Sequence, residues 1–380
     1  MPYQHRVLEQ KLNEYLGFFS IIGLTGPRQS GKSTLLLKIL PNYTYVNFDD
    51  IRFIEAFYDD PEKFMRIYHD KVIFDEVQRV PELFLYIKMA VDKDRTSCGK
   101  FVLTGSGQFV LMQHISESLA GRIGLLSLLP YQFTEIPPEL QDESVFRGGY
   151  PELVGKQYRL MEDWFSSYMD TYLNKDVRLL ANIGDLRDFS RLIHLLAANT
   201  AQPLNLSRYA NDLGVDVKTV KKWISVLEAS YIIFLLPPYH NNYGKRIVKS
   251  PKVYFYDTGL VSYLVGITDR AHYEKGPMAG SLFENYIISE ICKRELHQKS
   301  NAELFYYRTS HGVEVDLIID RKQYKEFIEI KSTETYTARM KSAIAALVGD
   351  EDKAFLIYKG ETLNLDPIVQ IVNYKQYLQL

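Results

Sequence analysis

Short apolar runs alternate with helical stretches over residues 18–135. Four of these runs are rich in β-branched and aromatic residues, which is typical of buried strands. Strands that alternate with helices favour a parallel sheet with helices on both faces, because each parallel connection needs a crossover. The pattern therefore predicts a doubly wound α/β domain over residues 1–150. The predicted strands are Phe18–Thr25, Tyr43–Phe48, Lys71–Phe74 and Lys100–Thr104.

The pattern changes after Gly148–Pro151, where long amphipathic helices occupy roughly residues 158–230. We assign residues 151–252 to a helical domain. From Gly280 onward the order is helix, strand, strand, strand, helix, so residues 253–380 are predicted to form a second α/β domain. Pro237–Pro238 and Gly266–Gly280 are the expected joints, because proline and glycine interrupt both kinds of regular element.

A phosphate-binding loop follows the first predicted strand. Residues 26–34 fit the pattern G-x-x-x-x-G-K-[ST] in full, and an apolar helix comes directly after them. Glycines let backbone N–H groups wrap phosphate oxygens at a helix N-terminus. We expect Lys32 to reach the β- and γ-phosphates of ATP and Ser33 to bind Mg²⁺. The predicted nucleotide-binding residues are Gly26, Pro27, Arg28, Gln29, Ser30, Gly31, Lys32, Ser33 and Thr34.

A second strand ends in two acidic residues, about forty residues behind this loop. We expect Asp75 to hold the Mg²⁺ shell and Glu76 to polarise the attacking water as a general base. A further strand ends near two hydroxyl residues, Thr104 and Ser106, and either one is placed to lie near the γ-phosphate. A turn that caps the strand explains the same two residues.

A single arginine, Arg122, follows Ser118–Gly121. A cation at the γ-phosphate of a neighbouring subunit stabilises the charge of the transition state. Arg122 is our candidate for this role, and an ordinary structural arginine is the alternative. If Arg122 acts between subunits, the protein is a homo-oligomer, for which a hexameric ring is one arrangement.

The helical domain contains helix-turn-helix patterning. A short helix ends at Gly214, and Asp216 is suited to cap a second helix whose apolar face carries Val217, Val220, Ile224 and Leu227. The acid-free stretch 240–252 follows, and it resembles the wing of a winged helix. Contact of these cations with DNA phosphates releases counterions; a module that packs or binds protein, with solvated lysines, is the alternative. The predicted DNA-binding residues are Lys218, Lys221, Lys222, Lys245, Arg246 and Lys249, and Lys252 belongs to the same basic stretch.

The C-terminal domain carries a candidate acidic cluster. Two alternating strands joined by a short polar segment, Asp320–Lys325, place Asp316 beside Glu329 and Lys331 if the register allows. Glu284, in a preceding helix, completes the set. Asp316 and Glu329 are the candidate metal ligands and Lys331 would orient water, which suits metal-assisted phosphodiester hydrolysis. An alternating strand with exposed charges needs no such function.

Composition limits the remaining choices. A formal charge of -2 and a pI near 6.5 exclude a globally basic nucleic-acid coat, so any such binding needs local patches. Two cysteines exclude a disulfide framework and fit a reducing compartment. The N-terminus lacks the apolar run of a signal peptide, and the apolar stretches are too short to span a bilayer. We expect a cytoplasmic protein.

Taken with these motifs, the whole chain resembles the predicted AAA+ superfamily ATPases of archaea and bacteria that carry a C-terminal domain of unknown function with a restriction-endonuclease-like fold. The resemblance implies an ATPase core, a winged helix and a nuclease-like tail with Glu284, Asp316, Glu329 and Lys331 in the nuclease-type pattern. No clear second arginine sensor is seen; Arg178 and Arg187 are unassigned. The resemblance rests on residues 26–34, 74–78, 103–106, 119–122, 148–152, 250–259 and 312–316.

Two functions fit these observations. The first is an ATP-hydrolysing machine that binds and remodels branched or duplex DNA, with or without metal-dependent cleavage. The alternative is a nucleotide-gated regulatory switch that binds protein partners and carries an inert nuclease-like domain. A small-molecule kinase is disfavoured, because no acceptor site is evident after the ATPase core.

Overall fold

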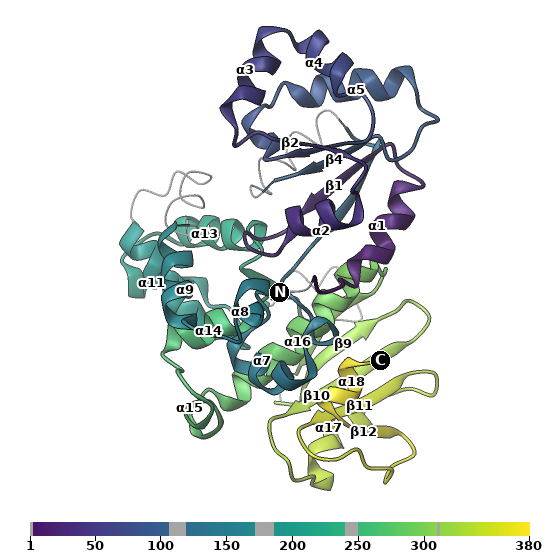
Figure 1. The fold of residues 1–380 in the computed structure, drawn as a ribbon. Helices are drawn as coiled ribbons and strands as arrows, with labels where there is room; N and C mark the ends of the chain where they lie inside the picture. The colour runs from purple at the N-terminus through teal and green to yellow at the C-terminus, as the bar shows by residue number, and fades with distance from the viewer. Residues whose placement is uncertain (1–2, 106–118, 172–185, 240–249, 310–311) are drawn as a thin grey trace.

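The computed structural model describes residues 3–105, 119–171, 186–239, 250–309 and 312–380. Figure 1 shows a parallel sheet with helices on both faces, a helical middle part and a C-terminal sheet, with the long helix α16 (Ala279–Gln298) running between them. Among the described residues, no helix combines the length and the apolar character that crossing a bilayer requires.

The N-terminal sheet is parallel throughout and has the order β2-β3-β4-β1-β5. All four strands expected from the sequence are present, and the first begins three residues later than predicted. The fifth strand was not predicted. The strands are β1 (Ile21–Thr25), β2 (Thr44–Asn47), β3 (Val72–Asp75), β4 (Phe101–Thr104) and β5 (Ile123–Ser127).

Helices cover both faces of this sheet (Figure 1). Alternate strand residues such as Phe74 and Leu103 join an aromatic-rich core beneath α3, α4 and α5. Their neighbours Ile73 and Val102 pack on the other face, against α1 and α2. A parallel sheet covered on both faces needs apolar residues at nearly every strand position, which is why the strands read as continuous apolar runs. The helices are α1 (Leu8–Leu16), α2 (Lys32–Ile39), α3 (Ile51–Asp59), α4 (Pro61–Ile67) and α5 (Leu83–Lys93).

A connector leads from β5 into the helical part. It contains two short 3₁₀ turns and then three helices that pack into the large central core. Its elements are η2 (Phe133–Glu135), η3 (Pro138–Leu140), α7 (Gln141–Arg147), α8 (Pro151–Gly155) and α9 (Met161–Tyr168).

The helix-turn-helix pattern is present as α12 (Leu206–Leu213) and α13 (Val217–Ala229), after α11 (Leu186–Ala198). Gly214 ends α12 in the left-handed conformation, and Asp216 accepts a hydrogen bond from Thr219 N at 2.8 Å to cap α13. Val217 is 42% exposed, so the prediction that it joins the buried face is wrong; Trp223 is buried there instead.

An antiparallel pair, β6 (Ile233–Leu236) and β7 (Lys252–Phe255), follows α13. We call this pair the β6–β7 hairpin. Pro203 bridges Lys252, so a third segment lies along the edge of β7. The domain boundary predicted after residue 252 falls inside β7.

The C-terminal sheet is mixed, with the order β12-β11-β10-β9-β8. β9 and β10 form the predicted antiparallel pair, whereas β10, β11 and β12 run parallel. Helices α14 and α15 precede α16, and α17 packs on the outer face. The elements are α14 (Thr258–Val265), α15 (Arg270–Lys275), β8 (Glu303–Arg308), β9 (Glu314–Asp320), β10 (Lys325–Lys331), α17 (Ser342–Ala345), β11 (Lys353–Tyr358), β12 (Val369–Asn373) and α18 (Tyr374–Leu378).

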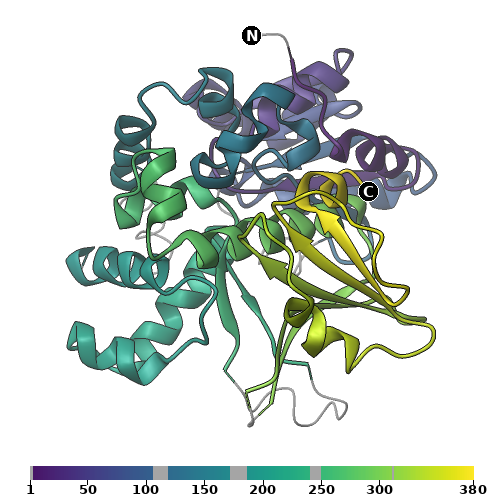
Figure 2. The same ribbon diagram turned by 90° about the horizontal axis from the view of Figure 1, so that it is seen from below.

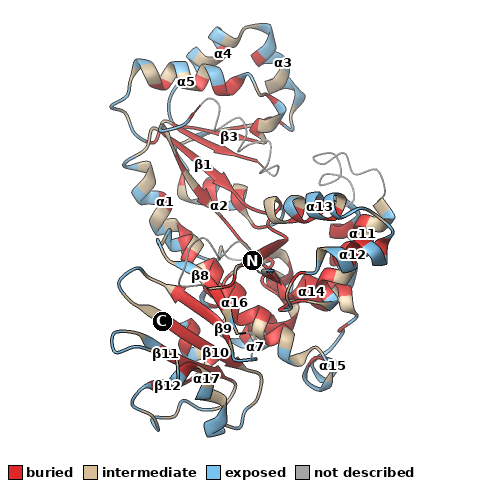
Figure 3. Cartoon of the chain, turned by 180° about the vertical axis from the view of Figure 1, so that it is seen from behind, coloured by how far each residue is buried: buried red, intermediate tan, exposed pale blue. Residues whose placement is uncertain are grey.

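Helix α16 contacts the N-terminal domain, the β6–β7 hairpin and the C-terminal sheet. Figure 2 shows it crossing the molecule beside the C-terminal sheet, and Figure 3 shows that most of its length is buried. It contacts α1 and β5 of the N-terminal domain, β7 of the hairpin, and β10 and α18 of the C-terminal sheet. A helix that is buried on most sides must satisfy its polar residues internally, and Glu290, Lys293 and His297 of α16 do so by contacting the connector.

Candidate functional site

The phosphate-binding loop joins β1 to α2 at the carboxyl edge of the parallel sheet. Gly26 and Gly31 have φ values of 141° and 92°, which side chains rarely adopt. A Cβ on Gly26 would also lie 2.1 Å from the Leu128 carbonyl oxygen. Ser30 Oγ donates to Pro27 O at 2.9 Å and holds the loop closed. The loop therefore presents the N-terminus of α2 as an anion site.

Lys32 is buried at the start of α2. Its ammonium donates to Gly26 O at 3.0 Å and to Pro27 O at 2.8 Å. Burial lowers the pKa of Lys32 to about 8, although the charges of Glu76 and Asp75 oppose that shift. A phosphate would supply the negative charge that this buried ammonium lacks.

Asp75 ends β3 next to the loop, as predicted. Its Oδ2 accepts hydrogen bonds from Ser33 Oγ at 2.7 Å and from Tyr45 OH at 2.5 Å, and its Oδ1 accepts one from Glu76 N at 3.0 Å. A hydroxyl and a carboxylate in contact are suitable ligands for Mg²⁺, so the two predicted ligands fit this ion. Glu76 has a φ of 55°, and its carboxylate accepts a hydrogen bond from Gln78. Tyr45 and Gln78 were not foreseen.

β4 lies between β1 and β3 and brings Thr104 to the same edge. Leu24 pairs with Thr104, and Thr104 Oγ1 is buried with no hydrogen-bond partner among the described residues. Gln78 packs directly against Gly105, because a Cβ there would lie 2.2 Å from Gln78 Oε1. The other hydroxyl candidate, Ser106, lies outside the described residues.

Arg122 lies at the opposite edge of the sheet. It precedes β5, whose first residue Ile123 pairs with Ile21 at the start of β1. Its guanidinium donates to both oxygens of Asp92 on α5, at 2.8 and 3.1 Å. It is therefore directed away from the phosphate-binding loop of its own chain.

A cavity of about 650 Å³ adjoins the phosphate-binding loop at Gly31 and Thr34. Two tyrosines and two prolines supply apolar and planar walls, and Gln4 and Glu139 add polar groups. The tyrosines are Tyr3 and Tyr131, and the prolines are Pro137 and Pro151. Arg6 and Lys156 also line the cavity.

Two contacts tie the loop to the rest of the chain. Arg6 donates to Ser30 O at 2.9 Å and to Leu129 O at 2.6 Å, so it bridges the loop and the connector. Tyr231, which precedes β6, places its hydroxyl 2.9 Å from Thr25 Oγ1, next to Gly26. Neither residue was predicted, because each partner is distant in sequence.

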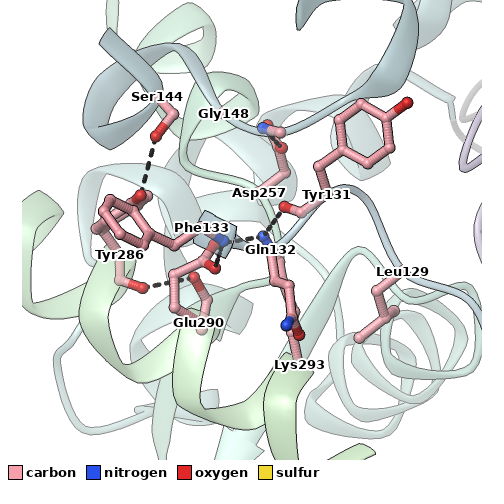
Figure 4. Close-up of polar contacts among 12 residues, drawn as sticks. Leu129, Tyr131, Gln132, Phe133, Ser144, Gly148, Asp257, Tyr286, Glu290 and Lys293 are labelled. Carbon is pink, nitrogen blue, oxygen red and sulfur yellow. Dashed lines mark hydrogen bonds and ion pairs between the residues drawn. The ribbon is translucent and has the colours of Figure 1, made fainter. Parts of the chain in front are cut away.

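The connector is bound in turn by α16 (Figure 4). Phe133 N donates to Glu290 Oε2 at 2.6 Å, and Lys293 Nζ donates to Tyr131 O at 3.2 Å. Leu129 N donates to His297 Nε2 at 3.2 Å. Polar contacts therefore run from the phosphate-binding loop, through Arg6 and the connector, to α16.

The three predicted lysines of α13, Lys218, Lys221 and Lys222, are exposed on one side of the helix. Lys245, Arg246 and Lys249 lie outside the described residues, as does Arg178. Arg187 is exposed on α11. The prediction that Lys252 belongs to an exposed basic stretch is wrong. Lys252 is 2% exposed and forms ion pairs with Glu284 and Glu314 of the C-terminal domain.

The structure brings together the four predicted residues of the acidic cluster. Asp316 on β9 accepts a hydrogen bond from Ile330 N at 2.8 Å. Lys331 Nζ lies 2.5 Å from Glu329 Oε1 and 3.9 Å from Asp316 Oδ2. Glu284, on α16, lies close enough to Asp316 for their charges to interact. Three residues that were not predicted join them: Lys252, Tyr254 and Glu314.

The acidic cluster carries more negative than positive charge, with four carboxylates and two lysines. Burial, followed by the charge of Asp316, raises the pKa of Glu284 to about 7 and that of Glu329 to about 8. Within the described part of the chain, Glu329 Oε2 is buried without a hydrogen-bond partner. An unpaired buried carboxylate oxygen and an excess of negative charge fit a divalent cation. Among the described residues, however, no three acidic, histidine or cysteine side chains converge as a ligand set.

Comparisons with known families divide the chain into three parts. The profile of an AAA domain matches residues 19–137. Two profiles described as domains of unknown function, DUF8612 and DUF4143, match residues 138–271 and 279–377.

Similar proteins occur in bacteria and archaea. The uncharacterized protein Rv2008c of Mycobacterium tuberculosis is 28% identical over 365 residues, which are 95% of this chain and 81% of that protein. An uncharacterized protein of Haemophilus influenzae is 24% identical and covers 71% of this chain and 74% of its own length. The Walker-type ATPase PABY2304 of Pyrococcus abyssi is 16% identical, with a TM-score of 0.47, over 68% of this chain and 94% of that one. Residues 19–137, with their phosphate-binding loop and parallel sheet, are similar to an AAA domain.

Proposed function

We propose that this protein is an ATP-hydrolysing machine that binds and remodels DNA, branched or duplex, as a homo-oligomer. The observation that carries the proposal is the joint placement of Lys32, Ser33 and Asp75 at one sheet edge, together with the exposed lysines of α13 in the helix-turn-helix. The AAA domain match supports ATP binding and hydrolysis.

In the proposed nucleotide site, Lys32 turns from the loop carbonyls to the phosphates, and Ser33 and Asp75 hold Mg²⁺. Mg²⁺ would neutralise phosphate charge. Glu76 polarises the attacking water, and the Thr104 hydroxyl, which lacks a partner, is available beside it. The adjoining cavity between Tyr3 and Tyr131 accommodates the base. Arg122 would leave Asp92 to reach the phosphates of a neighbouring subunit.

In the proposed DNA site, residues 186–255 form a winged helix. Three helices, an antiparallel hairpin and the bridge at Pro203 support this assignment. Lys218, Lys221 and Lys222 contact phosphates from α13. Phosphate contacts of this kind give affinity without sequence preference.

In the proposed C-terminal site, Asp316 and Glu329 hold a divalent cation that would activate water for phosphodiester cleavage. Lys331 orients that water. The strand pairing that places Asp316 beside Glu329 supports a restriction-endonuclease-like arrangement.

The steady-state ATPase rate of the full chain, with no DNA, with duplex and with a four-way junction, tests the proposal. Changing Lys218, Lys221 and Lys222 to alanine should weaken DNA binding and reduce its salt slope by about 3. A matched variant with Lys63, Lys275 and Lys353 changed to alanine removes equal charge elsewhere. An ATPase that is indifferent to every nucleic acid, without salt-dependent binding, would contradict the proposal.

A nucleotide-gated switch that binds protein partners is the second candidate. The burial of Lys252 among the carboxylates favours it, because the acidic cluster is already partly neutralised. In that case Lys32→Ala should abolish partner exchange, whereas Asp316→Ala should leave it intact.

A further inference from the structure

The β6–β7 hairpin reaches into the acidic cluster of the C-terminal domain. Lys252 Nζ lies 3.0 Å from Glu284 Oε1 and 2.7 Å from Glu314 Oε1. Tyr254 OH, two residues further along β7, donates to the same Glu284 oxygen at 2.7 Å. Because alternate residues of a strand share a face, β7 holds Glu284 with two donors at once.

We propose that Lys252 is the resident counter-cation of the acidic cluster and competes with a divalent metal for Glu284. The proposal rests on the proposed metal-binding role of the acidic cluster and adds a residue from another part of the chain to it.

The geometry favours competition over a purely structural ion pair. Lys252 and Tyr254 both use Glu284 Oε1, and Lys331 uses Glu329 Oε1, so a lysine holds one oxygen of each of these two carboxylates. The charge of Asp316 acts on both Glu284 and Glu329, and among the described residues Glu329 Oε2 has no hydrogen-bond partner. The acidic cluster is thus arranged around ammonium groups, with residual negative charge.

The position of Lys252 on the β6–β7 hairpin links its contact with Glu284 to the position of the hairpin. Lys252 pairs with Leu236 at one end of the β6–β7 hairpin, and Tyr231, just before the hairpin, lies at the phosphate-binding loop. A shift of the hairpin along its length would withdraw Lys252 and Tyr254 from Glu284 together. The metal affinity of the acidic cluster would then depend on the position of the hairpin.

Mn²⁺ titration of the full chain without nucleotide tests the proposal. Lys252→Met removes the ammonium, Lys252→Arg keeps the charge, and Lys353→Met is the matched control at an exposed lysine. Asp316→Asn defines the Mn²⁺ bound elsewhere. We expect Lys252→Met to bind Mn²⁺ about tenfold more tightly than the wild type, because a competing charge is gone. Lys252→Arg and Lys353→Met should bind it as the wild type does.

The double variant Lys252→Met, Glu284→Gln should lose the gain. A folded Lys252→Met protein with unchanged Mn²⁺ affinity overturns the proposal, and so does a gain that survives Glu284→Gln. If Lys252→Met melts without cooperativity, Mn²⁺ should restore a cooperative transition, since metal binding stabilises the folded state; failure to restore it also overturns the proposal. If no variant binds Mn²⁺ through Asp316, the metal role itself is wrong, whereas DNA-stimulated ATP hydrolysis is judged separately by its rate.

Discussion

Tyr231 and Thr25 join the β6–β7 hairpin to the nucleotide site. Their hydroxyl oxygens lie 2.9 Å apart, and Ser127 Oγ lies 2.7 Å from the same tyrosine hydroxyl. Thr25 is the residue before Gly26. A movement of the phosphate-binding loop would therefore be transmitted through Thr25 to Tyr231, just before β6. The contact is buried, and buried hydroxyl networks favour one arrangement over others.

We expect Tyr231→Phe to separate ATP hydrolysis from its response to DNA. The basal ATPase rate should stay within about twofold, because Tyr231 is not a ligand of the nucleotide. Stimulation by DNA should be lost, because the variant removes the contact between the hairpin and Thr25. The loss of this hydroxyl should cost about 1 kcal/mol of stability. Tyr43→Phe is the control, since Tyr43 donates to Gly99 O at 2.6 Å in the same domain. Equal DNA stimulation in both variants would contradict this role.

Arg122 offers a test of assembly. If it acts on a neighbouring subunit, Arg122→Ala should lower the ATPase rate by about 100-fold or more. Lys32→Ala should also be inactive. A mixture of the two variants should regain activity, because a Lys32→Ala subunit supplies Arg122 to the intact loop of the other. Asp92→Ala, which frees Arg122, should keep activity. A mixture that stays inactive, or a rate per subunit that is independent of protein concentration, would rule out a shared site.

Gly148 is held where no side chain fits. Its φ is 77°, and an added Cβ would lie 2.1 Å from Asp257 Oδ1, whose other oxygen accepts a hydrogen bond from Gly149 N at 2.7 Å (Figure 4). Gly214 has a similar φ of 71° but open space around it. Gly214→Ala should therefore cost only the backbone term, about 1 kcal/mol. Gly148→Ala should cost about 2 kcal/mol more, as chemical denaturation would measure; equal costs would contradict the steric argument.

Local pattern explains which parts of the site the sequence predicted. The phosphate-binding loop, Asp75, and the hairpin with Asp316 and Glu329 are set by neighbours within a few residues, so their spacing indicates their geometry. Arg6, Tyr231 and Lys252 are different, because each meets a partner far along the chain. Lys252 stands in an acid-free stretch and was assigned to a basic surface. The packing of β7 against α16, which no local pattern specifies, turns it toward Glu284.

The last prediction concerns acid sensitivity at the connector. His297 on α16 is fully buried; its Nε2 accepts a hydrogen bond from Leu129 N at 3.2 Å, so the ring proton is on Nδ1 and faces Gln132 Oε1 at 3.2 Å. Burial, followed by the charges of Arg6 and Lys293, lowers the pKa of His297 well below its ordinary value.

The unfolded chain therefore takes up a proton at His297 before the folded chain does. The stability that this difference provides is present above the ordinary histidine pKa of about 6.5 and is lost as the pH falls below it. Denaturation between pH 7.5 and 5 should show a decline that His297→Gln makes shallower, because glutamine does not titrate. His69→Gln is the control, since His69 is exposed after α4 in the N-terminal domain. A decline that is identical in the wild type and in His297→Gln would exclude His297 as its source.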